Sequence, residues 1–169
     1  MSSALTLPGR VLDARVEDGR LYLHLTNGLG AIDAGRLEIL AHLAPLQLPP
    51  KSVNRLEVVF EELIANVVRH GFTPGSDQSI LVTVTPTPQQ IDLVFEDDGI
   101  PFDPLARPEP APFTTLASST VGGRGLPMVR RFTSSFAYEA MPTAAIGCEV
   151  ARRGFFPVNR VSVSIPTAG

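Results

Sequence analysis

The sequence predicts an α/β fold: a two-layer sandwich with a mixed, mainly antiparallel sheet and helices packed on one face. Short strand-like runs with alternating apolar residues accompany longer stretches whose apolar residues recur at helical spacing. The chain has 169 residues, 44% of them apolar, which suits the length and the core of one ordinary domain. Because no repeat or clear boundary interrupts the pattern, residues 1–169 are predicted to form a single domain.

The N-terminal part predicts a β-hairpin followed by a helix. Apolar-rich runs at 11–16 and 20–25 flank Asp18-Gly19, and an Asp-Gly pair between two strands is typical of a tight hairpin turn. Residues 31–43 then carry apolar side chains at helical spacing, and the prolines from Pro45 onward end this helix.

The longest predicted helix runs from Ser52 to His70, a stretch without proline or glycine. Its apolar residues cluster on one face, Ser52 is a candidate N-cap, and Gly71 is a candidate C-cap. Taken alone, the polar face is explained most simply as a solvated helix surface. Helical spacing brings four of its side chains together: Arg55, Glu62, Asn66 and Arg69.

The second half of the chain predicts further strands around an irregular segment. Residues 80–85 and 91–96 alternate as half-buried strands, joined through a turn that contains prolines. A proline-rich and then Thr/Ser-rich stretch follows as far as Thr120, and a loop of this length is usually functional or disordered. The pattern ends with a short helix and then strand-like runs, at 126–132, 134–139 and 159–165.

Composition excludes several classes of protein. A net charge of −3 argues against a dedicated nucleic-acid binder, which needs clustered Lys and Arg. The single cysteine, Cys148, excludes an intrachain disulfide framework and a cysteine-based zinc site, and we expect it to be an inert thiol. No apolar run is long enough to span a membrane and no signal peptide is evident, so a cytoplasmic location is expected.

Two glycine-containing turns suggest a ligand site. Asp97-Asp98-Gly99 follows a predicted strand directly, and a carboxylate beside glycine lets a planar ligand approach the backbone closely. Gly122-Gly123-Arg124-Gly125 precedes the short helix, where free N–H groups and the helix dipole favour an anion such as phosphate. Each turn alone is a weak indication, because Asp-Gly turns and glycine-rich loops are common.

Together with the helix at 52–70, these turns resemble the nucleotide-binding boxes of the GHKL (Bergerat-fold) ATPase superfamily, most closely those of bacterial anti-sigma-factor serine/threonine kinases. Residues 61–71, with Glu62 and Asn66 four positions apart, are similar to the N-box. Residues 97–104, ending in Pro-Phe-Asp-Pro, and residues 122–132 are similar to the first and second glycine boxes. The resemblance covers roughly residues 20–139 and the final strand, and it implies the histidine-kinase-like ATPase fold.

The resemblance implies a role for each matching residue, with ATP and Mg²⁺ as the ligands. Glu62 would be the catalytic residue that orients the attacking hydroxyl, and Asn66 would bind the nucleotide and Mg²⁺. Asp97 would accept from the adenine amine, Gly99 would leave room for the ring, and residues 103–121 would form the ATP lid. The remaining nucleotide-binding residues would be Arg69, His70, Gly123, Gly125 and Leu126.

The resemblance also implies partners: an anti-anti-sigma-factor-like protein as the phosphorylated substrate, and a sigma factor that the chain regulates by binding. No direct contact with nucleic acid or membrane is expected, and a homodimer is left open because relatives of this type commonly form one. Two alternatives stay open: a nucleotide-gated protein-binding module without significant kinase activity, and a detached histidine-kinase-type ATPase domain. Glu62 and Asn66 favour the kinase over the binding module, and the Pro-Phe-Asp-Pro segment favours the anti-sigma type over the histidine-kinase type.

Two segments depart from the resemblance. An N-terminal hairpin extension, about residues 8–25, begins before the matching region. An enlarged C-terminal hairpin, about residues 140–158, separates Tyr138-Glu139 from Asn159, where the family has a short turn. This second segment is explained most simply as a long loop without a role, and an extra strand or a partner-binding flap are the other interpretations.

Overall fold

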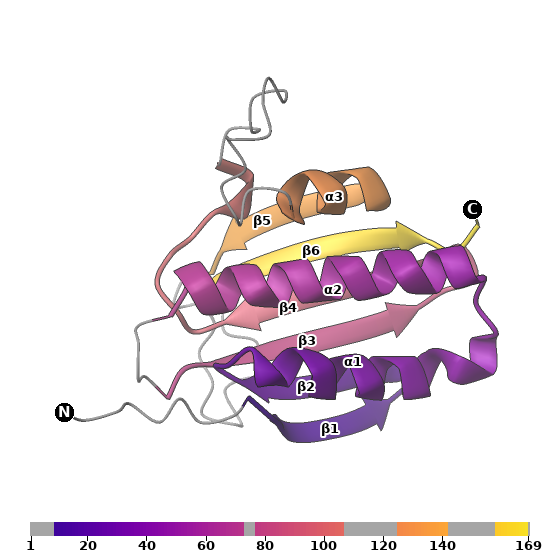
Figure 1. Cartoon of the computed structure of the whole chain (residues 1–169), viewed down its shortest axis with the longest axis horizontal. Helices are drawn as coiled ribbons and strands as arrows, with labels where there is room; N and C mark the ends of the chain where they lie inside the picture. Colours follow the sequence, from indigo (N-terminus) through magenta and orange to yellow (C-terminus); the bar gives the residue numbers. More distant parts are fainter. Residues whose placement is uncertain (1–8, 73–76, 107–124, 142–157, 169) are drawn as a thin grey trace, which may run out of the picture.

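A sheet of six strands is the base of the fold (Figure 1). The computed structural model describes residues 9–72, 77–106, 125–141 and 158–168. Within these residues every strand pair is antiparallel. In spatial order the strands are β1 (Val11–Glu17), β2 (Arg20–Thr26), β3 (Ser79–Pro86), β4 (Gln90–Asp97), β6 (Asn159–Pro166) and β5 (Ser135–Ala140).

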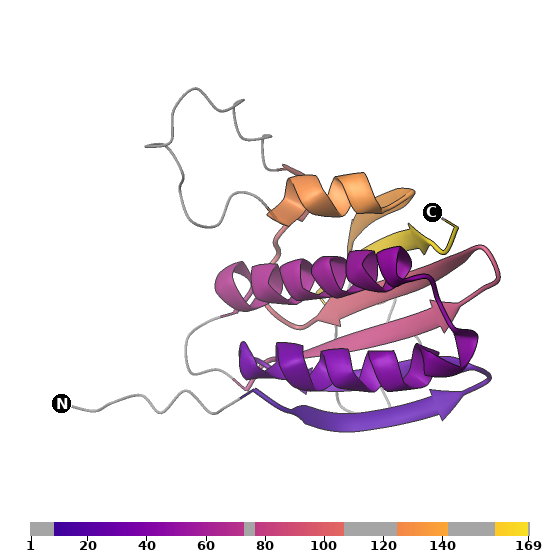
Figure 2. The same cartoon turned by 45° about the vertical axis from the view of Figure 1, so that its right-hand side comes forward.

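The helices form a second layer on one face of this sheet (Figures 1 and 2). This arrangement confirms the predicted two-layer α/β sandwich, and the sheet, predicted to be mixed and mainly antiparallel, is antiparallel throughout its described strands. Strand and helix boundaries agree with the predicted ranges to within one or two residues at each end, because the apolar periodicity fixes which residues face the core. The helical elements are α1 (Gly30–Leu43), η1 (Ala44–Leu46), α2 (Pro50–His70), η2 (Pro104–Ala106) and α3 (Gly125–Phe132).

The N-terminal hairpin turns at the predicted Asp-Gly pair. Asp18 and Gly19 both have positive φ, of 49° and 76°. Two consecutive positive φ angles are those of the tight turn that matches the twist of antiparallel strands, and glycine adopts them without a steric cost. The pairing of Glu17 with Arg20 places this turn at the end of the β1–β2 ladder.

The start of α2 differs from the prediction. The helix begins at Pro50 with Pro49 as its N-cap, so Ser52 is not the cap. Proline suits the first turn of a helix because the N–H that it lacks has no partner there. The side chain of Ser52 is instead buried, and its hydroxyl donates to the carbonyl oxygen of Thr167 (2.9 Å), which fastens the segment after β6 to α2. At the other end Gly71 is the C-cap, as predicted.

The hydrophobic core lies between the helices and the sheet. The predicted apolar face of α2 supplies Phe60 and Ile64, which are almost completely buried. The ring of Phe60 packs against that of Phe95 on β4, with the centroids 6.2 Å apart. Burial of this face attaches α2 to the middle of the sheet, so the direction of its polar face is fixed as well.

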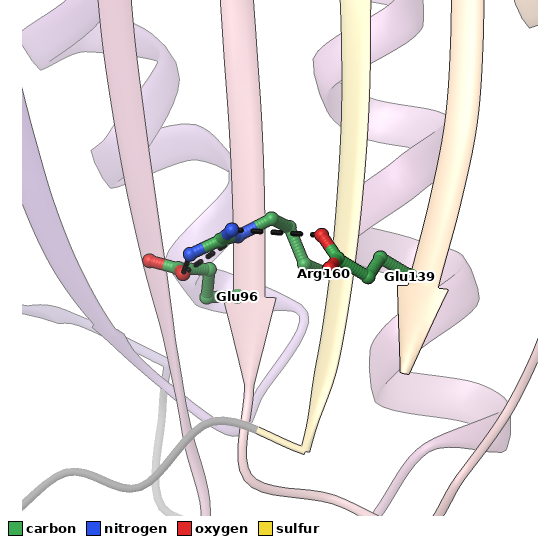
Figure 3. Close-up of polar contacts among 3 residues, drawn as sticks. All are labelled: Glu96, Glu139 and Arg160. Carbon is green, nitrogen blue, oxygen red and sulfur yellow. Dashed lines mark hydrogen bonds and ion pairs between the residues drawn. The ribbon is translucent and has the colours of Figure 1, made fainter. Parts of the chain in front are cut away.

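The other face of the sheet carries a network of charges (Figure 3). Arg160 of β6 donates from Nε and Nη2 to Oε1 of the buried Glu96 on β4 (3.0 and 2.7 Å). The same guanidinium lies 3.6 Å from Glu139 on β5. Because Glu96 and Arg160 are register partners, this network holds three neighbouring strands in one alignment.

The C-terminal strands form the predicted hairpin ends. β5 and β6 pair as far as Ala140 and Asn159, and the N–H of Met141 donates to the carbonyl oxygen of Val158 (2.8 Å). Residues 142–157 lie outside the described residues, so the interpretations of this segment stay predictions. Within the described part of the chain, no helix combines the length and the apolar character that crossing a membrane requires.

Truncating Phe60 tests the packing of α2. Phe60→Ala should lower the free energy of unfolding by about 3–5 kcal/mol, because it leaves a cavity between α2 and β4. Urea unfolding followed by far-UV circular dichroism measures the change. The control is Leu37→Ala on α1, which should alter stability by less than about 0.5 kcal/mol because Leu37 is 61% exposed. Equal losses for both variants would contradict this account of the core.

Candidate functional site

The candidate site lies where the C-terminal end of α2 meets one end of the sheet. β4 ends at Asp97 and β6 begins at Asn159, and these two residues are register partners. The chain leaves α2 at Gly71, whose carbonyl oxygen accepts from the N–H of Ile100 (2.7 Å). The predicted N-box and first glycine box therefore meet at this corner of the molecule.

A pocket opens at this corner between α2 and the sheet. Asn66 of α2, Asp97 of β4 and Asn159 of β6 supply its polar lining. Phe102 and Phe95 are among its apolar lining residues. Apolar walls with a few polar groups are typical of a site for a ring-containing ligand.

Asp97 is a buried carboxyl group, with only 4% of its surface exposed. Its Oδ1 accepts from the backbone N–H of Gly99 (3.0 Å) and from the side-chain amide of Asn159 (2.9 Å). Burial raises the pKa of Asp97 from 3.8 to about 6; the bonds from Asn159 and Gly99 oppose this rise, and the charge of Asp98 adds to it. A carboxylate with this pKa is ionised at neutral pH and is available as an acceptor.

Asn159 uses both ends of its side-chain amide. Besides the bond to Asp97, its Nδ2 donates to the carbonyl oxygen of Ile100 (2.8 Å). Its Oδ1 accepts from the N–H of Phe102 (3.1 Å) and from the hydroxyl of Tyr138 on β5 (2.8 Å). One buried amide therefore joins two strands to the segment that follows β4.

Gly99 is required by a close approach of two backbone segments. A β-carbon at this position would overlap the carbonyl oxygen of Gly71 at the end of α2. The family resemblance implies that Gly99 leaves room for a ring. The structure adds a steric reason for glycine here, because a side chain would separate α2 from the turn after β4.

Glu62 lies against the beginning of α3. A β-carbon at Gly125, the first residue of α3, would overlap the carboxylate of Glu62. α2 and α3 pack side by side, and Leu126 packs against the core next to this contact. The predicted catalytic carboxylate and the end of the predicted second glycine box are thus neighbours.

The remaining predicted residues are placed differently. The ring of His70 stacks on Phe102, with the centroids 5.4 Å apart and the planes tilted by 21°. Arg69 is exposed and is not one of the residues that line the pocket. Gly123 and most of the predicted lid, 103–121, lie outside the described residues. Their predicted roles in nucleotide binding stay predictions.

Sequence reasoning assigned no role to Asn159 or Tyr138, although it noted both positions. A signal for Asn159 was present in the alternation of β6. Every second residue of β6 faces the core, and the buried residues on this face after Asn159 are Val161, Val163 and Ile165. A polar residue at position 159 therefore also faces the core. An inward-facing amide needs partners, and such a residue is a candidate for a buried polar network.

Within the described residues, no group of His, Cys, Asp and Glu side chains forms a metal-binding cluster. On α2 the pocket offers a hard cation the amide oxygen of Asn66, with Glu62 one helical turn away. Carboxylate and amide oxygens are chemically suited to Mg²⁺, which takes few protein ligands when phosphates supply the rest.

Comparison with known proteins identifies the family. Residues 26–147 match the family described as histidine kinase-like ATPase domain. The serine/threonine-protein kinase BtrW of Bordetella bronchiseptica is 31% identical over 84 residues, which are 50% of this chain and 59% of that protein. The anti-sigma F factor of Bacillus velezensis is 22% identical over 107 residues, 63% of this chain and 73% of that protein.

Replacing Asp97 by Asn tests the burial of this carboxyl. The folded chain binds the Asp97 proton more tightly than the unfolded chain, so stability falls as the pH rises from about 4 to above 6. Asp97→Asn removes this loss, because an amide oxygen still accepts from Gly99 and Asn159. The variant should be more stable by about 3 kcal/mol at pH 8 and nearly equal to the parent near pH 4.

Urea unfolding at pH 4, 6 and 8 measures this difference. Asp92→Asn is the control, because Asp92 is only half-buried on the opposite face of β4. A gain in stability for Asp97→Asn that stays constant from pH 4 to pH 8 would show that the proton of Asp97 is not involved.

Proposed function

The chain belongs to the histidine kinase-like ATPase domain family, and from this premise we propose that it is an ATP-dependent serine/threonine protein kinase of the anti-sigma-factor type. The observation that carries the proposal is the meeting of Asn66 and Asp97 in one pocket, with Glu62 beside the start of α3. Relatives named as a serine/threonine kinase and an anti-sigma factor support the same class.

Asp97 would recognise the adenine base. Its ionised carboxylate accepts hydrogen bonds and donates none, so it favours the exocyclic amine of adenine over the carbonyl oxygen of guanine. The apolar side chains of Phe102 and Phe95 in the same pocket suit the faces of a ring. This end of the site would therefore select ATP over GTP.

The polar face of α2 and the start of α3 would hold the phosphates. Asn66 lies along α2 between the base end of the pocket and Glu62, and its amide oxygen would bind Mg²⁺. Mg²⁺ in this position would neutralise charge on the phosphates. The backbone N–H groups at Gly125 and Leu126 begin α3, where the positive end of the helix dipole favours an anion.

Glu62 would accept the proton of the attacking serine or threonine hydroxyl. The hydroxyl oxygen forms a bond to the γ-phosphorus, the bond between this phosphorus and the β–γ bridging oxygen breaks, and ADP leaves. Positioning and charge neutralisation supply most of the acceleration in such a transfer. A correctly placed base adds about 10²- to 10⁴-fold in rate.

The protein substrate would be an anti-anti-sigma-factor-like protein, and a sigma factor would be the regulated partner. Support for these partners comes from the names of the two relatives, a serine/threonine kinase and an anti-sigma factor. The match spans 59% of the length of the first relative and 73% of the second. Phosphorylation adds a charge of about −1.5 to −2 at the modified residue, which would change the electrostatic contacts that the substrate makes with its partner.

Asn66→Ala should abolish Mg²⁺-dependent binding of ATP, because it removes the amide oxygen assigned to the metal. Isothermal titration calorimetry with and without Mg²⁺ measures the loss, which should exceed tenfold. Asn54→Ala is the matched control, because Asn54 is an exposed asparagine on the same helix. Undiminished affinity of the Asn66 variant in the presence of Mg²⁺ would overturn the assignment of this residue.

Glu62→Gln should retain ATP binding and lose at least a hundredfold in phosphoryl transfer, because the amide cannot accept the proton. Its control is Glu61→Gln, since Glu61 is the exposed neighbour on α2. The assay captures proteins from lysate on the immobilised chain with and without ATP, and then measures their phosphoserine and phosphothreonine.

The two alternatives give different results in this assay. A binding module without kinase activity would capture a partner in an ATP-dependent way and leave it unphosphorylated. A histidine-kinase-type domain would yield acid-labile phosphohistidine. Equal phosphoserine formation by the Glu62→Gln variant and the parent would remove the proposed role of Glu62.

A further inference from the structure

The buried side-chain amide of Asn159 makes four hydrogen bonds at the pocket, one of them to Asp97. We propose that Asn159 is a positioning residue for nucleotide binding: it fixes the Asp97 carboxylate in one orientation and favours its ionised form, so that Oδ2 can accept from the base. The inference rests on the proposed function, because it assumes that Asp97 recognises adenine.

The orientation of the Asn159 amide is set by its partners. Nδ2 faces two acceptors, Oδ1 of Asp97 and the carbonyl oxygen of Ile100, while Oδ1 faces the N–H of Phe102 and the hydroxyl of Tyr138. The reversed amide would place oxygen against the two acceptors and NH₂ against the N–H of Phe102. Only one orientation satisfies these groups, and with 2% exposure no water competes for them.

This amide in turn leaves one oxygen of Asp97 for a ligand. Among the described residues, the donors to the Asp97 side chain, Asn159 and Gly99, both bond to Oδ1. Two donors on the same oxygen restrict rotation of the carboxylate. Oδ2 is then left to accept from a base in the pocket that Asp97 lines, with the carboxylate already held in place.

The groups around Asp97 have opposing effects on its pKa, so the effect of Asn159 can be measured through the pH dependence of binding. Burial and the adjacent Asp98 raise the pKa of Asp97, and the hydrogen bonds from Asn159 and Gly99 oppose them. From the neighbouring elements, Tyr138 of β5 donates to Oδ1 of Asn159, and burial together with the charges of Asp103 and Asp97 raises the pKa of its hydroxyl. Asp103 lies in the segment after β4, and α2 contributes Asn66, which is uncharged, and His70, which stacks on Phe102.

The register of β6 makes this role possible. Glu96 and Arg160 pair on one face of the sheet, and the next pair along, Asp97 and Asn159, faces the pocket. A slip of one residue would bring Val158 or Arg160 opposite Asp97 and would turn Asn159 to the other face. The ion pair of Figure 3 thus aligns the two strands at the position where the amide is needed.

The test is the pH dependence of ADP binding by Asn159→Asp, compared with the parent by calorimetry between pH 5.5 and 9. The new side chain keeps an oxygen for Phe102 and Tyr138, loses the donor to Asp97, and places a second carboxyl beside it. As the pH is lowered, the affinity of the variant should start to fall about two pH units above the pH at which the affinity of the parent falls. At pH 7 the loss should be about tenfold, and it should largely disappear by pH 9.

Two further variants separate positioning from a structural effect. Asn159→Leu removes the donor without adding a carboxyl. The pH below which ADP affinity falls should therefore rise in this variant as well, but by a smaller amount than in Asn159→Asp. Ser162→Ala, on the opposite face of β6 and not in the pocket lining, leaves the bond between Asn159 and Asp97 in place and should change affinity by less than twofold at every pH. Titration of the ADP phosphates is common to all the proteins and cancels in the affinity ratios.

Each outcome has a separate meaning. A loss of affinity in both Asn159 variants that is the same at every pH, or no loss, would overturn the role of Asn159. A parent protein that binds no adenine nucleotide at any pH would instead overturn the proposed function. Thermal unfolding of each variant identifies the folded proteins to be compared, and a folded Asn159→Leu variant suffices for the decision.

Discussion

The antiparallel pairing of β4 with β6 is the constraint on which the site depends. It places a buried acid, Asp97, opposite a buried amide, Asn159, at the end of the sheet where α2 also ends. Neither group is stable in the core alone, because a buried polar group without partners costs several kcal/mol. Their mutual bond, with those to Gly99, Ile100, Phe102 and Tyr138, makes the corner one polar unit inside an apolar surrounding.

α2 connects this unit to the opposite end of the pocket. Its apolar face attaches it to the sheet through Phe60, so its polar face presents Asn66 and Glu62 along one line. Glycines at positions 99 and 125 permit close contact at both ends of that line, one with the backbone of Gly71 and the other with the carboxylate of Glu62. A rigid helix between two close contacts gives the site a fixed length, which suits a ligand with a base at one end and phosphates at the other.

Local sequence patterns predicted the elements well and the long-range partners poorly. The Asp-Gly turn and the stretch free of proline and glycine are local signals, and the structure has the hairpin and α2 where these signals lie. Ser52 resembles a helix cap in its local context, but its partner Thr167 is 115 residues away. Asn159 and Asp97 are 62 residues apart, and no local pattern reveals that β6 inserts between β4 and β5. The roles of Glu62, Asn66 and Asp97 came from a resemblance, and the structure adds the contacts that bring them together.

The insertion of β6 between two earlier strands has a consequence for synthesis on the ribosome. β5 precedes β6 in the chain, yet among the described strands it pairs only with β6. The polypeptide emerges from its N-terminus, so β1 to β4 and the core beneath α2 can assemble while β5 still lacks its neighbour. Asp97 therefore lacks its hydrogen bond from the side-chain amide of Asn159 until Asn159 has been translated. The nascent chain would acquire a folded core first and the ability to bind a ligand last.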